Sequence, residues 1–555
     1  MLVAYPSDIS WSPKTLIDRW CDSHGLETYE SDRVTVRCSG RWTVSEDSKI
    51  SFFDGTAYEW PAGNPTDATS SALQLSRSIG SFTSLVVDRG RLAITRSLYR
   101  STSIFYTNVD GRPLISSNIS ILVAASGGFE WQKLDRDYCR DFIACRERFD
   151  GSTALQNVRE VMLGERVVIT ENGQYSGEFI NGPIPSETGI AETIRRTLHL
   201  FTRLHSKVAL YFSGGFDSSA LLWALRANQT DVIAVHVDSH TDCGESEYSD
   251  ALLVANDMSC DVLRVMVEEP DYRLGFVADL ATPVHTPYDV PLLAPATSPY
   301  FEALEFDISI TGHGGDHVFV QNPESNAAFS HLRAGRLLTF LSVVQKLAQL
   351  KGMSSFDIVR DNIRLLLNLR SMSTIDPPWL PSSYHELDER HYLLRGLDRR
   401  TAKHKHLSTI LAGLHTIPPS TGGRRSLAPL LLQNIIGLTA GMPVDTTFSK
   451  THDRTSVREA IFASAGQAFA WRRTKRASST FFYQLLSQSQ GNIVRSVRDS
   501  KLAHELDINT ALLIDDIKRN GCVSRTQTLK SILNFYRLDA YLRASEFQAR
   551  EILRR

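Results

Sequence analysis

The chain has 555 residues, of which 42% are hydrophobic and 22% are charged, and its net charge is -2. This balance excludes a global attraction to nucleic acid or to an anionic membrane, so any basic function has to be local. The seven cysteines show no paired C-x-x-C spacing for zinc or redox chemistry. No stretch reaches the ~18 apolar residues of a membrane span, and the first residues lack the basic region of a signal peptide. We expect a cytoplasmic protein with no membrane span and no nucleic-acid partner.

The first third of the chain, residues 1 to about 185, consists of short alternating runs broken by Gly, Asp and Ser, which predict strands of a mainly antiparallel layer. The runs lie at residues 33–37, 84–88, 91–95, 103–106, 113–117 and 166–170. In order along the chain, residues 81–88, 104–106, 114–117 and 161–165 resemble the glutamine-amidotransferase domain that precedes the synthetase domain in asparagine synthetases. This resemblance implies an Ntn-hydrolase-like α+β domain over residues 1–190.

One departure from that family concerns the nucleophile. The glutaminase form of the domain needs a cysteine as its processed N-terminal residue, because the thiolate attacks the glutamine amide. Here Leu2 follows Met1, and the nearest cysteine, Cys21, lies in a predicted helix over residues 15–21. We therefore expect a degenerate amidotransferase-like domain without the catalytic Cys, which makes no ammonia and has a structural or substrate-docking role.

After a predicted linker at residues 186–190, strands and helices alternate. Strands are predicted at residues 208–212, 232–237, 262–267 and 307–311, and helices at residues 191–204, 218–227 and 247–257. A βαβ series implies a parallel sheet whose ligands bind at the carboxyl ends of the strands. After Leu332 the chain is mainly helical. The fold class is therefore α/β, with a second domain over residues 191–555 that has a parallel sheet and a helical C-terminal part.

The turn after strand 208–212 has the pattern Ser-Gly-Gly-x-Asp-Ser-Ser. It precedes a helix, so free backbone N–H groups and the helix dipole favour a phosphate there. A carboxylate beside phosphates needs a divalent cation between them, so Asp217 predicts Mg²⁺. The alternative is an ordinary βα turn rich in small residues. The predicted ATP-binding residues are Ser213, Gly214, Gly215, Asp217, Ser218 and Ser219.

This pattern resembles the PP-loop of the ATP pyrophosphatases, which cleave ATP between the α and β phosphates. The Gly-Lys-[Ser/Thr] ending of a Walker loop is missing. The resemblance therefore implies a PP-loop ATP-pyrophosphatase domain, of the adenine nucleotide α-hydrolase-like class.

A second glycine-rich turn, Gly312-His-Gly-Gly-Asp-His317, follows strand 307–311. It should lie beside the first turn, so that Asp217 and Asp316 make a Mg²⁺–pyrophosphate clamp. Gly312, Gly314 and Val237, at the end of strand 232–237, complete the predicted ATP site. The alternative is a glycine-rich surface turn with a solvated Asp316.

The second turn resembles the Gly-x-Gly-Ser-Asp-Glu signature of the asparagine synthetase family. Its second position is Glu in asparagine synthetases and Tyr in β-lactam-forming relatives, where it lies next to the nucleophile. It is His313 here, so the resemblance implies a general base, although a structural histidine is an equal alternative. His317 replaces the acidic residue that follows the Asp in the family. Upstream, Tyr288-Asp289-Val290 resembles a loop that shapes the acceptor pocket, which makes Asp289 a candidate catalytic residue.

A third cluster, residues 471–480, has four cations in five positions next to three hydroxyl groups. Such a run is usually a solvated face. Together with residues 426–436, 441–443 and 456–460, it resembles the asparagine synthetase stretch that ends in the lysine contacting pyrophosphate and the reacting acyl group. Lys475 is the matching lysine, and Arg458 matches the arginine of that family's Leu-Arg-Glu. Both are candidate catalytic residues.

Most of residues 205–545 resembles the lasso-peptide macrolactam synthetases, the cyclases of microcin-type peptide biosynthesis. The matching stretches are residues 312–323, 433–436, 440–443, 474–479 and 533–538. The resemblance implies a bacterial enzyme that uses ATP and Mg²⁺ to adenylate an Asp or Glu side chain of a precursor peptide. The peptide's N-terminal amine then attacks, which yields a macrolactam, AMP and pyrophosphate.

The partners implied by this resemblance are the precursor peptide and the leader peptidase or leader-recognition protein of the same pathway. An asparagine synthetase-like or β-lactam synthetase-like ligase acting on a small substrate would use the same three loops. A binding-only scaffold is a further alternative, which Asp217, Asp316 and Lys475 disfavour.

Overall fold

The computed structural model describes most of the chain. The described residues are 1–7, 11–31, 33–39, 43–46, 50–59, 72–88, 91–239, 247–267, 286–290, 304–369, 376–381, 391–417, 426–466, 468–472, 487, 489–520 and 526–554.

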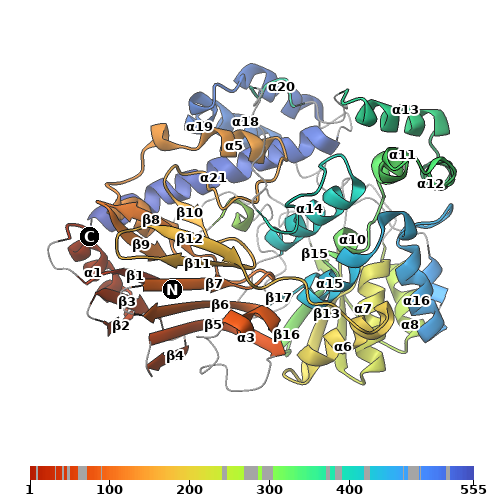
Figure 1. Ribbon diagram of the computed structural model, residues 1–555, viewed down its shortest axis with the longest axis horizontal. Helices are drawn as coiled ribbons and strands as arrows, with labels where there is room; N and C mark the ends of the chain where they lie inside the picture. The colour runs from red at the N-terminus through yellow and green to blue at the C-terminus, as the bar shows by residue number, and fades with distance from the viewer. Residues whose placement is uncertain are drawn as a thin grey trace.

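The N-terminal third forms two six-stranded antiparallel sheets (Figure 1). The strand order is β10-β8-β9-β1-β3-β2 in the first sheet and β12-β11-β7-β6-β5-β4 in the second. The strands are β1 Leu2–Pro6, β2 Glu27–Glu30, β3 Val34–Cys38, β4 Thr43–Glu46, β5 Ile50–Glu59, β6 Ile79–Asp88, β7 Arg91–Arg96, β8 Phe105–Val109, β9 Arg112–Ser116, β10 Arg159–Glu160, β11 Glu165–Ile169 and β12 Tyr175–Phe179. The predicted antiparallel layer is confirmed, as two layers.

The two sheets pack against each other through alternate residues of their strands. Leu2 and Ala4 of the first sheet share one buried cluster with Leu85 and Val167 of the second. A period of two directs these apolar side chains to one face of each sheet. The other face of the first sheet packs against three helices, α1 (Lys14–Ser23), α4 (Ile119–Ala125) and α5 (Arg136–Ile143). A further helix of this part of the chain, α3, spans Ala72–Arg77. The predicted helix at residues 15–21 lies within α1.

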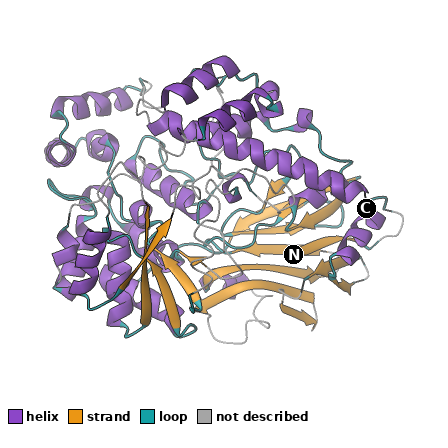
Figure 2. Cartoon of the chain, turned by 180° about the vertical axis from the view of Figure 1, so that it is seen from behind, coloured by secondary structure: helices purple, strands orange, loops and turns teal. Residues whose placement is uncertain are grey.

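A five-stranded parallel sheet follows, with the strand order β15-β14-β13-β16-β17 (Figure 2). Its elements are α6 Ile190–Thr202, β13 Lys207–Tyr211, α7 Phe216–Ala227, β14 Asp231–Ser239, α8 Tyr248–Asp257, β15 Val262–Val267, β16 Ile308–Thr311 and β17 Ser426–Leu427. The predicted α/β fold class is confirmed, and the predicted bounds differ from these by one or two residues in most elements. The short strand β17 was not predicted.

The remainder is helical, as predicted. The helices are α10 Gly315–Val318, α11 Phe329–Arg333, α12 Leu337–Lys351, α13 Ser355–Leu366, α14 Ala402–His415, α15 Gln433–Gly441, α16 Thr455–Ala465, α18 Gln490–Arg498, α19 Lys501–Glu505, α20 Thr510–Asn520 and α21 Thr526–Arg554. Helix α21 returns to the start of the chain and packs on α4 and α5 (Figure 1). The core beneath the first sheet is therefore built from both ends of the chain.

Within the described part of the chain, no helix combines the length and the apolar character needed to cross a lipid bilayer.

Candidate active site

The first glycine-rich turn connects β13 to α7 at the carboxyl edge of the parallel sheet. Gly214 has a φ of +72°, and a Cβ at this position would lie 2.6 Å from the Cα of Ala251 in α8. Both the left-handed backbone and the close approach require glycine. Gly215 caps α7 without a side-chain hydrogen bond to the first turn. No side chain therefore caps this helix N-terminus, and the binding of a phosphate there stays a prediction.

The serines of this turn have different surroundings. Ser213 is exposed, and its Oγ lies 3.3 Å from the Oγ of Ser218, which donates to the Gly215 carbonyl at 3.1 Å. Ser219 is buried, and its Oγ has no hydrogen-bond partner among the described residues. Ser213 is thus the serine best placed to contact a phosphate, while Ser219 faces the protein interior.

The second glycine-rich turn lies directly against the first, because β16 runs parallel to β13 with Thr311 opposite Tyr211. A Cβ on Gly312 would lie 3.0 Å from the backbone nitrogen of Ser218, and a Cβ on Gly315 would lie 2.4 Å from the carboxyl carbon of Asp217. The predicted meeting of the two turns is confirmed. Only glycine lets the Asp217 carboxylate approach the backbone that carries Asp316.

Other predicted ATP-site residues lie at the same edge. Gly314 has a φ of +86°, and a Cβ there would lie 2.3 Å from the Cγ of Leu431. Val237 is 37% exposed on β14, two residues beyond the point where β14 pairs with the end of β13. Gly314 therefore shapes the turn, and Val237 lies where a ligand above the strand ends can reach it.

Asp217 has a partner that sequence reasoning missed. The Nη1 of Arg454 donates to both carboxylate oxygens of Asp217, at 2.7 and 2.6 Å, and both side chains are buried. The backbone of Arg454 has a φ of +55°, a strained conformation for a residue other than glycine. Burial opposes the charge of Arg454, but the carboxylates of Asp217, Asp453 and Asp316 hold the pKa of its guanidinium above the usual value. The sequence signal that could have identified Arg454 is its position, four residues before Arg458 and at the start of the same helix, α16.

A magnesium ion shared between Asp217, Asp316 and a nucleotide stays a prediction. Mg²⁺ in nucleotide sites is held by one or two carboxylates together with phosphate oxygens. Among the described residues, no group of three His, Cys, Asp or Glu side chains gathers to hold a metal by itself. Asp316 is 43% exposed at its side chain, whereas both Asp217 oxygens contact Arg454. A metal at Asp217 therefore competes with the guanidinium.

Arg458 is buried behind the same loops and contacts the backbone. Its guanidinium donates to the carbonyls of Asp453 and Ala470, at 2.9 and 2.7 Å, and stacks 4.4 Å above the ring of Phe216. Burial and the nearby charge of Arg454 lower the pKa of Arg458. These contacts tie the start of α7 to the chain that leads into the basic run, which is a positioning role. A catalytic role for Arg458 stays a prediction.

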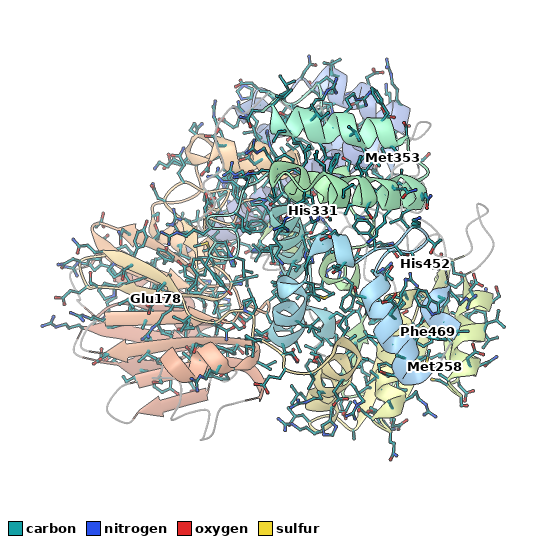
Figure 3. The ribbon with its side chains drawn as sticks, turned by 45° about the vertical axis from the view of Figure 1, so that its right-hand side comes forward. Glu178, Met258, His331, Met353, His452 and Phe469 are labelled. Carbon is teal, nitrogen blue, oxygen red and sulfur yellow. The ribbon has the colours of Figure 1, made fainter. Side chains whose placement is uncertain are left out.

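Lys475 lies outside the described residues, but Trp471 and Arg472, the first two residues of the basic run, are described. Arg472 pairs with Asp250 of α8 at 2.7 Å, and Asp250 precedes the Ala251 that Gly214 touches. His452 contacts the carbonyl of Trp471 at 3.2 Å, and Figure 3 shows His452 near α16. The basic run therefore begins beside the first glycine-rich turn.

His313 projects toward the end of α14. Its Nε2 lies 3.0 Å from the Gly413 carbonyl, so this nitrogen carries the proton, and Thr416 Oγ1 lies 3.3 Å away. Burial lowers the pKa of His313, with a smaller contribution from His317. The imidazole is therefore neutral at pH 7, with Nδ1 as its acceptor. The neutral imidazole is compatible with both predicted roles of His313, a structural contact through Nε2 and a general base at Nδ1.

Asp289 makes an ion pair with Arg100, a residue of the N-terminal part that sequence reasoning also missed. Its carboxylate also accepts from the backbone N–H and the hydroxyl of Thr286, at 2.9 and 3.0 Å. The guanidinium of Arg100 also donates hydrogen bonds to the carbonyl oxygens of His415 and Ile417, at 2.8 and 2.6 Å. Through Arg100, Asp289 thus connects its loop to the end of α14, the helix that His313 also contacts. A catalytic role for Asp289 stays a prediction.

A cavity of about 50 Å³ lies between the N-terminal part and this loop. Thr286, Tyr288, His391 and His415 line one side, and residues 146–149 line part of the other. Burial lowers the pKa of His391 to about 3 and that of His415 to about 4, and it raises the pKa of Glu147 to about 7. The two histidines are therefore neutral at pH 7, and the charge on the wall of this cavity comes from Arg146, Arg148 and Glu160, with Glu147 partly ionised.

Three of the four cysteines of the N-terminal part have the surroundings of unreactive, structural residues. Cys21, Cys38 and Cys139 are buried. Burial raises the pKa of the Cys21 thiol to about 12 and that of Cys38 to about 11. Each of these thiols is protonated at neutral pH, and a protonated buried thiol is unreactive.

Comparison with known proteins assigns the chain to a family. The sequence model of one protein family, described as asparagine synthase, matches residues 189–519, which is more than half of the chain. The chain belongs to the asparagine synthase family. Members of this family use ATP, and the match covers both glycine-rich turns, Arg454 and Arg458.

Individual proteins are also similar to this member of the asparagine synthase family. The microcin J25-processing protein McjC of Escherichia coli is 28% identical over 348 residues, which are 61% of this chain and 62% of that protein. The matching region thus spans less than two thirds of the relative's length.

Among solved structures, the glutamine phosphoribosylpyrophosphate amidotransferase of B. subtilis complexed with ADP and GMP matches 48% of this chain and 81% of its own, with 9% identity and a TM-score of 0.22. A structure described as the allosteric regulatory enzyme of purine biosynthesis matches 48% of this chain and 74% of its own, with 9% identity and a TM-score of 0.20.

Proposed function

We propose that the chain is an ATP-dependent lasso-peptide cyclase. It adenylates an Asp or Glu side chain of a precursor peptide and joins that carboxyl group to the peptide's own N-terminal amine. The observation that carries the proposal is the contact between Asp217 and Gly315, which brings two acidic, glycine-rich turns to one sheet edge. The similarity to a microcin-processing protein supports a peptide as the substrate.

Activation comes first, because a free carboxylate is a poor electrophile. A carboxylate oxygen of the peptide attacks the α-phosphorus of ATP, and pyrophosphate leaves. The turn at residues 213–215 and the uncapped start of α7 bind phosphate oxygens. Asp217 and Asp316 would hold Mg²⁺ together with ATP, and the ion would neutralise part of the charge of the polyphosphate. Lys475 stabilises the charge that develops on the departing pyrophosphate.

Amide formation follows. The N-terminal amine attacks the acyl carbon, AMP leaves with the electron pair of the acyl–phosphate bond, and the amine gives up a proton. His313 accepts this proton at Nδ1, since its Nε2 donates to the Gly413 carbonyl. The ring closes around a peptide tail that the protein holds in place, which lowers the entropic cost of cyclisation.

The precursor peptide is delivered by the leader peptidase or leader-recognition protein of its pathway, in the bacterial cytoplasm. The N-terminal part is a degenerate amidotransferase-like domain that forms one wall of the cavity beside Tyr288.

The test uses the full chain, ATP, Mg²⁺ and a precursor peptide encoded beside this gene. We expect ATP–pyrophosphate exchange and a product that has lost one water. The matched control is the same peptide with an acetylated N-terminus, which should support exchange but no ring closure. Exchange with free aspartate and none with peptide would contradict the proposal and would favour the small-substrate ligase that the family match also allows.

A further inference from the structure

The helical hairpin of α12 and α13 carries an unusual share of exposed apolar side chains. Of eighteen large hydrophobic residues exposed among the described residues, nine lie between positions 337 and 369. Figure 1 shows this hairpin at the edge of the molecule, away from the two antiparallel sheets, and Figure 3 labels Met353 at its turn. The nine residues are Leu337, Leu338, Leu341, Met353, Phe356, Ile363, Leu366, Leu367 and Leu369.

This exposed set is additional to the face that each helix buries. Phe340, Val344 and Leu347 of α12 join Ile358 of α13 and Phe448 in a separate buried cluster. An ordinary surface helix has one apolar face, which is directed to the core. Among the described residues, the second apolar surface on this hairpin belongs to no buried cluster, and an exposed patch of this kind marks an interaction site.

The outward face of α13 has the spacing of a helix that pairs with another helix. Phe356, Arg360, Ile363 and Leu367 follow one another at intervals of four, three and four residues, and Phe356 is 71% exposed while Leu367 is 61% exposed. Residues at such intervals lie on one side of a helix. We call these four residues the α13 stripe.

Charges in and beside the stripe identify the partner. Asp357, Arg360, Asp361 and Arg364 alternate in sign, so the order of the charges is reversed about the midpoint between positions 360 and 361. Within one copy Arg360 pairs with Asp357 at 2.9 Å, and the side chain of Asp357 is still 40% exposed, so it can also face a second copy. Two antiparallel copies of α13 related by a two-fold axis at this midpoint place Asp357 of each copy opposite Arg364 of the other. The same register places Phe356 between Ile363 and Leu367 of the other copy. A self-complementary surface of this kind is what a two-fold interface requires.

We propose that the α13 stripe, flanked by the exposed leucines of α12, is the interface of a two-fold symmetric homodimer. The partner is a second copy of this chain, packed with α13 antiparallel to α13. The inference does not depend on the proposed catalytic function, because it uses only the shape and charge of the hairpin.

The test measures the mass of the full-length protein by light scattering and sedimentation between about 1 and 100 µM, a range that covers micromolar dissociation constants. The wild type should form dimers. Phe356→Glu should raise the dissociation constant at least about tenfold, because a charge replaces the most exposed apolar side chain of the stripe. Leu253→Glu, at a 59% exposed leucine of α8, is the matched control and should leave the dimer intact.

A charge exchange tests the register. Asp357→Arg should weaken the dimer by placing two cations opposite each other, and the double variant Asp357→Arg with Arg364→Asp should restore it. A wild-type monomer throughout the concentration range would overturn the proposal. So would a dimer that Phe356→Glu leaves unchanged, or a double variant no stronger than the single one. Circular dichroism of each variant confirms that the exposed substitutions keep the fold.

Discussion

Arg454→Met removes the only described hydrogen-bonding cation from a buried carboxylate. The two side chains of this pair are 4% and 11% exposed, and one Nη1 serves both oxygens of Asp217. Methionine has a similar length but cannot donate a hydrogen bond. Removing one partner of a buried ion pair costs about 3–5 kcal/mol, because the other charge is left without compensation. We expect the free energy of unfolding to fall by that amount.

Urea unfolding in metal-free buffer measures this loss. Arg333→Met is the matched control, since Arg333 is 54% exposed and pairs with Asp398 at the surface, where removing an ion pair costs at most about 1 kcal/mol. Mg²⁺ without nucleotide should stabilise the Arg454→Met variant more than the wild type, because the Asp217 oxygens then accept a metal without competition. A variant within about 1 kcal/mol of wild type, or an equal response of both proteins to Mg²⁺, would refute the reasoning.

Three further predictions concern chemistry and pH. Asp316→Asn should abolish ATP–pyrophosphate exchange while leaving the fold intact, since Asp316 is partly exposed; near-normal exchange would reject its role in the metal site. Lys475→Ala should reduce cyclisation by roughly 10²–10³ with little change in ATP affinity, because the ammonium stabilises charge that develops during reaction; activity within a few-fold of wild type would show that the basic run is only a solvated face. Stability should fall below pH 6.5, because buried His391, His406 and His415, with pKa values of about 3, 4 and 4, are neutral in the folded protein but become protonated on unfolding. Glu147, whose pKa is raised to about 7, opposes one of these three protons, so the net loss is about 2.7 kcal/mol per pH unit between pH 6 and 5. Urea unfolding at both pH values measures it, and equal stability would contradict these assignments.

Local patterns predicted the parallel sheet and the meeting of its two turns. Glycines at positions 214 and 312 predict turns, and the apolar runs before them predict strands. In a parallel sheet both strands end at the same edge, so the two turns are expected to meet there. The structure adds the reason for Gly315, which is the close approach of the Asp217 carboxylate. Such a reason is invisible in one sequence, because it depends on a residue about a hundred positions away.

Other features were beyond local patterns for the same reason. Arg454 pairs with a carboxylate 237 positions earlier, and Arg100 reaches Asp289 across the boundary between the two parts of the chain. The packing of α21 on α4 and α5 joins the two ends of the sequence. Long-range ion pairs and helix docking depend on tertiary structure and leave no periodic signal. Lys475 lies outside the described residues, so its place in the site stays a prediction.

The measurement that tests the central claim most directly is the product balance of a reaction with ATP and the precursor peptide. Mass spectrometry of the peptide and quantification of the nucleotides are made on the same sample. We predict a macrolactam that has lost one water, with one AMP and one pyrophosphate formed for each ring. Formation of ADP and phosphate, or consumption of ATP with free aspartate while the peptide stays linear, would contradict the account.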